Sequence, residues 1–151
     1  LLMGESMGGL NSAFLYLRSG NLFERAALNC PAIMGFGPLA PDEELDAYLE
    51  RHKNYINRFY VGYMQNWGKK EFPTIPDWER NAPLGLAKYL NRKSPTLYVS
   101  CGTQDQFGFI EGAYLLAEQA RSLGVNTTWV PLEKGGHCTI NSQTLADFLR
   151  P

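Results

Sequence analysis

The sequence lacks a surplus of charge of either sign. Among its 151 residues, 14 Lys and Arg stand against 15 Asp and Glu, which gives a net charge of -1. Proteins that bind nucleic acid or anionic membranes through charge carry a basic excess, so neither kind of partner is indicated. The sequence also has no apolar run near the roughly 20 residues that a helix needs to cross a bilayer, and we expect no membrane span.

Histidine and cysteine are scarce as well. The two histidines, His52 and His137, belong to no cluster with metal-ligand spacing, so we expect no metal and no other cofactor. The three cysteines, Cys30, Cys101 and Cys138, are odd in number and form no CxxC pair, so neither a disulfide framework nor a zinc ribbon is indicated. Their usage weakly favours a reducing compartment such as the cytoplasm. The compartment and the oligomeric state stay open.

The sequence does have an alternation of apolar runs and helical patterns. Strand signals occur at residues 1–3, 23–33, 94–105 and 125–133, and helical patterns at 8–18, 110–123 and 142–150. Strands that alternate with helices predict an α/β fold, with a parallel sheet that has helices on both faces. At this length the chain corresponds to a single domain.

Residues 34–93 interrupt this alternation and predict a helical insertion. Apolar residues recur at helical spacing over 41–67, as one long helix or as two short helices with the break most favoured at Gly62. Pro41 suits the first helical position. The following stretch, 68–85, contains three prolines and little periodicity, and it predicts a loop.

The stretch "MGESMGG" near the start places Ser6 between two glycines, after a strand signal and before a helix. The pattern G-x-S-x-G in this context is typical of a nucleophile elbow, a sharp turn that presents a serine hydroxyl at a helix N-terminus. Gly4 and Gly8 would allow a close backbone approach where a side chain would clash. The backbone N–H of Met7 would then help to bind an oxyanion.

A nucleophilic serine needs a base, and a histidine base needs a carboxylate that orients it. His137 and Asp105 each lie in a loop just after a strand signal, as Ser6 does. The carboxyl ends of parallel strands meet at one edge of a sheet, so we expect these three residues to converge there. Their order along the chain, Ser then Asp then His, is that of the α/β-hydrolases.

Other residues compete for these roles. His52, the other histidine, lies on a predicted helix rather than in a loop after a strand. The alternative for His137 is a structural histidine, and that for Asp105 is a turn residue. Glu111 and Glu133 are alternative candidates for the acid. Cys138 follows His137 directly, but a small buried residue explains it better than a nucleophile does.

Two regions are candidates for substrate contacts. The Tyr, Phe and Trp residues of 34–93 would form an apolar lid or acyl pocket, or would belong to a helix packed on the sheet. Phe107, Phe109 and Ile110 follow Asp105 closely and would line the same pocket.

The segments "GESMGG", "PTLYVSCGTQD" and "EKGGHC" resemble the α/β-hydrolase superfamily over nearly the whole chain. Within it, the GxSxGG elbow and the "GGH" segment are most similar to the esterase group that includes esterase D and feruloyl-esterase-like enzymes. The resemblance implies a serine hydrolase that cleaves small carboxylic esters through Ser6, His137 and Asp105 and an acyl-enzyme. An acyltransferase with the same triad and a non-catalytic binding module of this fold are the alternatives.

The resemblance also implies that residues 1–151 form a partial domain. In this superfamily the nucleophile follows the fifth strand of eight, so we expect the C-terminal half of the fold. We expect the upstream loop that supplies a second oxyanion donor to be missing as well. Function is therefore assigned to the full-length parent, and the isolated 151 residues are expected to be poorly soluble and nearly inactive.

Overall fold

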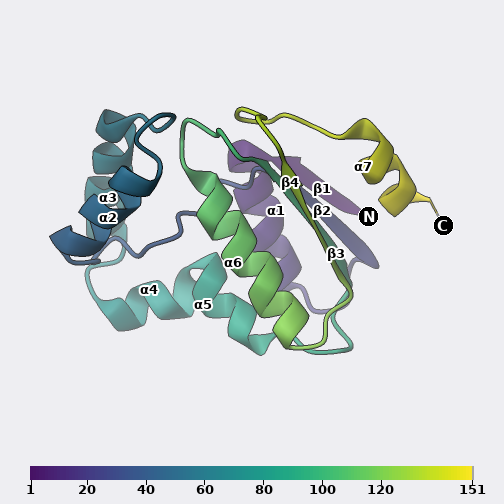
Figure 1. The fold of residues 1–151 in the computed structure, drawn as a ribbon. Helices are drawn as coiled ribbons and strands as arrows, with labels where there is room; N and C mark the ends of the chain where they lie inside the picture. The colour runs from purple at the N-terminus through teal and green to yellow at the C-terminus, as the bar shows by residue number, and fades with distance from the viewer. Residues whose placement is uncertain (151) are drawn as a thin grey trace.

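A four-stranded parallel sheet forms the centre of the molecule in the computed structural model, which describes residues 1–150 (Figure 1). The strands are β1 (Leu2–Glu5), β2 (Arg25–Asn29), β3 (Thr96–Gly102) and β4 (Thr127–Leu132), and they lie in the order β1-β2-β3-β4. The register places Met3 beside Ala27, Ala27 beside Tyr98 and Tyr98 beside Thr128. All four strand signals are therefore strands, and their carboxyl ends share one edge.

Helices cover both faces of this sheet, as the sequence predicts. Helix α1 (Ser6–Arg18) connects β1 to β2, and α6 (Phe109–Ser122) connects β3 to β4. Right-handed crossovers between successive neighbours put both helices on the same face. Helix α7 (Ser142–Leu149) lies on the other face, where the ring of Phe148 is 5.3 Å from that of Tyr98 (Figure 1).

The main hydrophobic core lies between the sheet and helices α1 and α6. Leu28, Leu97 and Val99 of the central strands have no exposed surface, and neither do Ala113 and Leu116 of α6. Burying a large aliphatic side chain contributes about 1.5–3 kcal/mol, so this layer supplies much of the stability. It also holds the strand ends, and the loops that follow them, in fixed relative positions.

The insertion at 34–93 begins with two helices, α2 (Asp42–Arg51) and α3 (Arg58–Glu71). The expected break at Gly62 is wrong, because the chain turns at residues 52–57 and Gly62 lies inside α3. The side chain of Asn57 accepts hydrogen bonds from the backbone N–H groups of Phe59 and Tyr60, which starts the second helix. The cap at Asn57 determines where α3 begins, and the helix accommodates Gly62 without ending there.

The loop expected at 68–85 is also a wrong prediction. Helix α3 continues to Glu71, and two short helices follow, α4 (Ile75–Asn81) and α5 (Pro83–Leu86), with a 3-10 turn at Ala87–Tyr89. The hydroxyl of Thr74 accepts the backbone N–H of Asp77, and prolines occupy the first turns of both helices. Proline at such a position favours a helix, because the missing N–H would have no intrahelical acceptor there.

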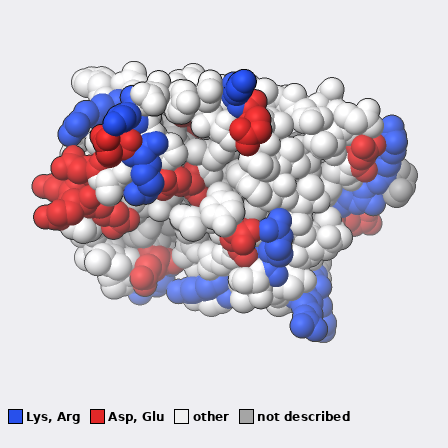
Figure 2. Space-filling model, in the orientation of Figure 1, with Lys and Arg blue, Asp and Glu red and all other residues white. Residues whose placement is uncertain are grey.

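Charged side chains are distributed over the surface without a single basic face in the view of Figure 2, where acidic residues gather at the end formed by α2. Among residues 1–150, no helix combines the length and the apolar character that crossing a membrane requires.

Candidate functional site

Ser6 lies at the junction of β1 and α1, where the chain turns sharply from strand to helix. Its φ of 51° is in the left-handed region, which is uncommon for a residue other than glycine. A Cβ atom on Gly4 would overlap the backbone of Gly8 and the hydroxyl of Ser12, so the turn requires glycine at that position. The strained backbone of Ser6 is therefore held by tight packing on one side of the turn.

The expected requirement for glycine at position 8 is a wrong prediction. A Cβ atom on Gly8 would meet no atom within 4 Å. The close approach is made instead by Gly9, whose Cβ atom would lie 2.9 Å from the Cα of Pro31. Gly9 thus allows α1 to pack closely against the segment after β2.

Ser6, His137 and Asp105 form a continuous hydrogen-bonded chain that joins the start of α1 to the loops after β3 and β4. His137 Nε2 lies 2.8 Å from Ser6 Oγ, and His137 Nδ1 lies 3.0 Å from Asp105 Oδ1. An ionised carboxylate only accepts hydrogen bonds, so Nδ1–H donates to Asp105 and leaves Nε2 of a neutral ring as an acceptor. The Ser6 hydroxyl can then donate to Nε2, which is the geometry that lets an imidazole take its proton.

Asp105 is almost completely buried, with 2% of its surface exposed. A buried carboxylate is unfavourable unless donors surround it. Besides His137, the backbone N–H of Phe107 donates to Oδ1 at 3.2 Å and that of Phe109 donates to Oδ2 at 2.8 Å. Phe109 is the first residue of α6, so this carboxylate also lies at a helix N-terminus, where negative charge is favoured.

Contacts between the loop after β3 and the loop after β4 bring His137 to Asp105. The backbone N–H of Gln104 donates to the carbonyl of Gly135 at 2.9 Å, and the N–H of His137 donates to the side-chain oxygen of Gln106 at 3.2 Å. A Cβ atom on Gly102 would overlap the carbonyls of Gly135 and Gly136. Sequence reasoning missed both Gln106 and Gly102, since their role depends on contacts between segments about 30 residues apart.

Two of the three residues expected to line a substrate pocket, Phe107 and Phe109, contact the imidazole of His137. The rings of Phe107 and Phe109 lie 4.6 and 5.6 Å from that of His137, both edge-on. Phe109 is buried, while Phe107 and Ile110 pack against the core as partly buried residues. The role of all three in substrate binding stays a prediction, while Phe107 and Phe109 visibly hold the His137 ring in place.

Solved structures share this architecture. No known family profile and no curated protein matches the sequence. The chain superposes over 89% of its length on the acylaminoacyl peptidase of Pyrococcus horikoshii, with 15% identity and a TM-score of 0.59. A bacterial esterase of the hormone-sensitive lipase family matches 90% of the chain (19% identity, TM-score 0.63), and a puromycin hydrolase matches 98% (19% identity, TM-score 0.64). The chain adopts part of the α/β-hydrolase fold.

The chain spans 19%, 43% and 20% of the lengths of these three proteins. At such low sequence identity the similarity shows the α/β-hydrolase fold alone. The finer likeness to the esterase D group stays a prediction.

The other histidine, His52, pairs with a different carboxylate, that of Glu111. His52 Nε2 lies 2.7 Å from Glu111 Oε1, and Arg51 donates to both oxygens of Glu111 at 2.8 and 3.0 Å. Glu111 therefore binds α2 to α6, and Asp105 is the carboxylate that contacts His137. Glu133, the other alternative acid, is exposed.

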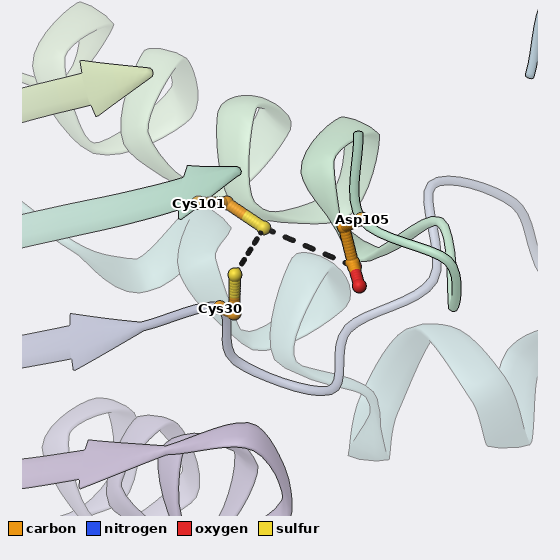
Figure 3. A group of neighbouring side chains, drawn as sticks. All are labelled: Cys30, Cys101 and Asp105. Carbon is orange, nitrogen blue, oxygen red and sulfur yellow. Dashed lines mark hydrogen bonds between the residues drawn. The ribbon is translucent and has the colours of Figure 1, made fainter. Parts of the chain in front are cut away.

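Within residues 1–150, one group of potential metal ligands includes Asp105 and two cysteines (Figure 3). Cys30, Cys101 and Asp105 offer ligand atoms within 4.8 Å of one another, and all three are buried. The two sulfur atoms are 2.7 Å apart, which leaves no room for an ion between them, and both oxygens of Asp105 already accept hydrogen bonds. Contact with the Cys30 sulfur and burial raise the pKa of the Cys101 thiol. The same contact lowers the pKa of the Cys30 thiol. The group therefore fits a hydrogen-bonded pair of cysteines, in which Cys101 keeps its proton, better than a metal site.

Proposed function

We propose that the full-length protein is a serine hydrolase that cleaves carboxylic esters, with Ser6 as nucleophile, His137 as base and Asp105 as the acid that orients the base. The observation that carries this proposal is the pair of contacts made by His137, one to the Ser6 hydroxyl and one to the Asp105 carboxylate. A serine hydroxyl becomes a strong nucleophile only when a neighbouring base accepts its proton. This arrangement supplies that base and fixes its tautomer.

The reaction would proceed in two halves. Ser6 Oγ attacks the carbonyl carbon of the ester while its proton moves to His137 Nε2, and the buried Asp105 stabilises the imidazolium. The tetrahedral intermediate expels the alcohol, which takes the proton from His137, and leaves an acyl group on Ser6. A water molecule then attacks the acyl-enzyme with His137 again as base, and the acid is released.

The oxyanion of the intermediate needs hydrogen-bond donors. Met7 lies in the first turn of α1, where backbone N–H groups have no intrahelical acceptor, so its N–H is available as one donor. The second donor is expected from a segment upstream of residue 1. For this reason the activity is proposed for the full-length protein, and the 151 residues alone are expected to be nearly inactive.

The choice of esters rests on the resemblance of the motifs, since the structural neighbours include both peptidases and esterases. The test is to compare the hydrolysis rates of an ester and an amide that carry the same acyl group, and we expect the ester to be cleaved faster. An acyltransferase would instead give a new ester or thioester when an alcohol or thiol acceptor is added. Product analysis with and without acceptors separates these reactions.

A fluorophosphonate probe tests the role of Ser6 directly. The full-length protein should be labelled, and Ser6→Ala should abolish the labelling. Ser142→Ala, at an exposed position at the start of α7, serves as the matched control and should be labelled as the wild type is. Labelling that persists in Ser6→Ala would refute the assignment, and a wild type that is never labelled would favour a non-catalytic binding module.

A further inference from the structure

A small apolar cavity lies beside the site, between α1, the segment after β2 and helices α3 to α5. Its volume is about 120 Å³. The lining residues important here are Leu10, Ala32, Met34, Gln65, Trp67 and Trp78. No Asp, Glu, Lys or Arg lines it, so a charged group would find no partner inside.

Two residues of the cavity wall, Ala32 and Leu10, are neighbours of Ser6. The backbone N–H of Ala32 donates to the carbonyl of Ser6 at 2.9 Å, and Ala32 is part of the cavity wall. Leu10 follows Ser6 by one helical turn on α1, so the two side chains lie on the same face of that helix. A group attached to a carbonyl at Ser6 Oγ could therefore reach this cavity.

Gln65 is the one amide side chain in the cavity wall. The residue is 8% exposed, on the inward face of α3 that also carries the buried Val61 and Gly68. Among residues 1–150, its Nε2 atom has no hydrogen-bond partner. Buried polar groups are nearly always paired, so an unpaired amide beside a cavity points to an acceptor that a ligand provides.

We propose that this cavity binds a neutral apolar group about the size of one aromatic ring, which carries a hydrogen-bond acceptor for Gln65 Nε2. An apolar cavity of about 150 Å³ in another protein holds one benzene molecule, and the present volume is of that order. A long fatty-acyl chain is too large for it. The group is the acyl part of the substrate, a step that rests on the proposed function of Ser6.

Binding can be measured without catalysis in the full-length Ser6→Ala protein. Two ligands of nearly equal shape, 4-fluoroacetophenone and 1-ethyl-4-fluorobenzene, differ in a ketone oxygen and can be followed by fluorine NMR. The ketone should bind about three- to tenfold more tightly, the gain expected from one hydrogen bond. Gln65→Leu should abolish this preference, whereas Gln143→Leu, on the exposed surface of α7, should keep it.

A second measurement needs no cavity variant. The side-chain amide protons of Gln65 should shift in nitrogen-edited NMR spectra when the ketone is added, and should shift much less with the hydrocarbon. Failure of both ligands to bind would overturn the proposal. The proposal would also be overturned if Gln65→Leu kept the preference for the ketone and the Gln65 amide, in the protein that retains it, did not shift on addition of the ketone.

Hydrolysis then tests the acyl assignment in the catalytically intact protein. The 4-nitrophenyl esters of phenylacetic, acetic and decanoic acid should give the highest kcat/KM for phenylacetate, by about tenfold. Ala32→Leu should lower the ratio of phenylacetate to acetate hydrolysis, because the added side chain fills the cavity. Hydrolysis without an aromatic preference would overturn the acyl assignment. Ketone binding without hydrolysis of any ester would overturn the proposed function and uphold the binding site alone.

Discussion

The backbone N–H of His137 donates a hydrogen bond to the side-chain oxygen of Gln106, 3.2 Å away, and so the loop that carries the proposed acid also anchors the loop that carries the proposed base. Catalysis by a positioned base depends on sub-ångström placement. Gln106 therefore acts on the site through His137, as a positioning residue.

We expect Gln106→Leu to lower kcat of the full-length protein by about tenfold to a hundredfold, with a smaller effect on KM, because the imidazole loses its anchor. Steady-state kinetics with one 4-nitrophenyl ester measure both constants. Gln104→Leu is the matched control, since the Gln104 side chain makes only a 3.5 Å contact with Tyr55. Equal effects of the two variants would remove the positioning role.

Glycines 102 and 62 should respond in opposite ways to the same substitution. A Cβ atom on Gly102 would overlap the carbonyls of Gly135 and Gly136, so Gly102→Ala should destabilise the protein by about 1–3 kcal/mol. A Cβ atom on Gly62 would meet nothing within 4 Å, and Gly62→Ala within α3 should stabilise it by up to about 1 kcal/mol. Urea unfolding of both variants measures the two changes. A neutral Gly102→Ala would mean that the two loops are free to separate.

The sequence predicted the position of a side chain well wherever that position follows from topology. Ser6, Asp105 and His137 could be expected at one edge because each follows a strand of a parallel sheet, a rule that needs no knowledge of contacts. It was a poor guide at Gln106 and Gly102, since their roles depend on how two loops meet in space. The short helices α4 and α5 were missed because three prolines suggested a loop, although the cap at Thr74 was a readable helix signal.

The contact between Glu111 and α2 makes stability depend on pH in a defined range. Burial alone would raise the pKa of the Glu111 carboxyl, but hydrogen bonds from His52 and Arg51 outweigh burial and lower its pKa to about 2. A carboxyl whose pKa is lowered on folding contributes stability that is complete above its unfolded pKa, near 4.5, and is lost as the pH falls toward 2.

Glu111→Gln should therefore be less stable than the wild type above pH 5, and most of the difference should be lost as the pH falls to about 2. Chemical unfolding at a series of pH values provides the free energies of unfolding. Glu118→Gln is the control on the same helix, because Glu118 pairs only with the exposed Arg121, and its small effect should change little over this range. A difference for Glu111→Gln that stays constant with pH would contradict the lowered pKa.

The three thiols should differ in reactivity by burial. Cys30 and Cys101 have no exposed surface, while Cys138 is partly exposed. Burial, with smaller effects of Glu5 and other neighbours, raises the pKa of Cys138 from 9.0 to about 11. Because the thiolate is the reactive form, Cys138 in the folded protein should react with a disulfide reagent at pH 8 about a hundredfold more slowly than in the unfolded chain.

Titration of the thiols with a chromogenic disulfide measures this directly. Of the three thiols within residues 1–151, one should react slowly in the folded protein, and unfolding in guanidinium should make all three react at once. Cys138→Ser should remove the slow phase without changing the two buried thiols. Rapid reaction of a second thiol in the folded protein would mean that solvent reaches the Cys30 and Cys101 pair. The neighbouring carboxylate of Asp105 would then also be more accessible to water than its 2% exposure indicates.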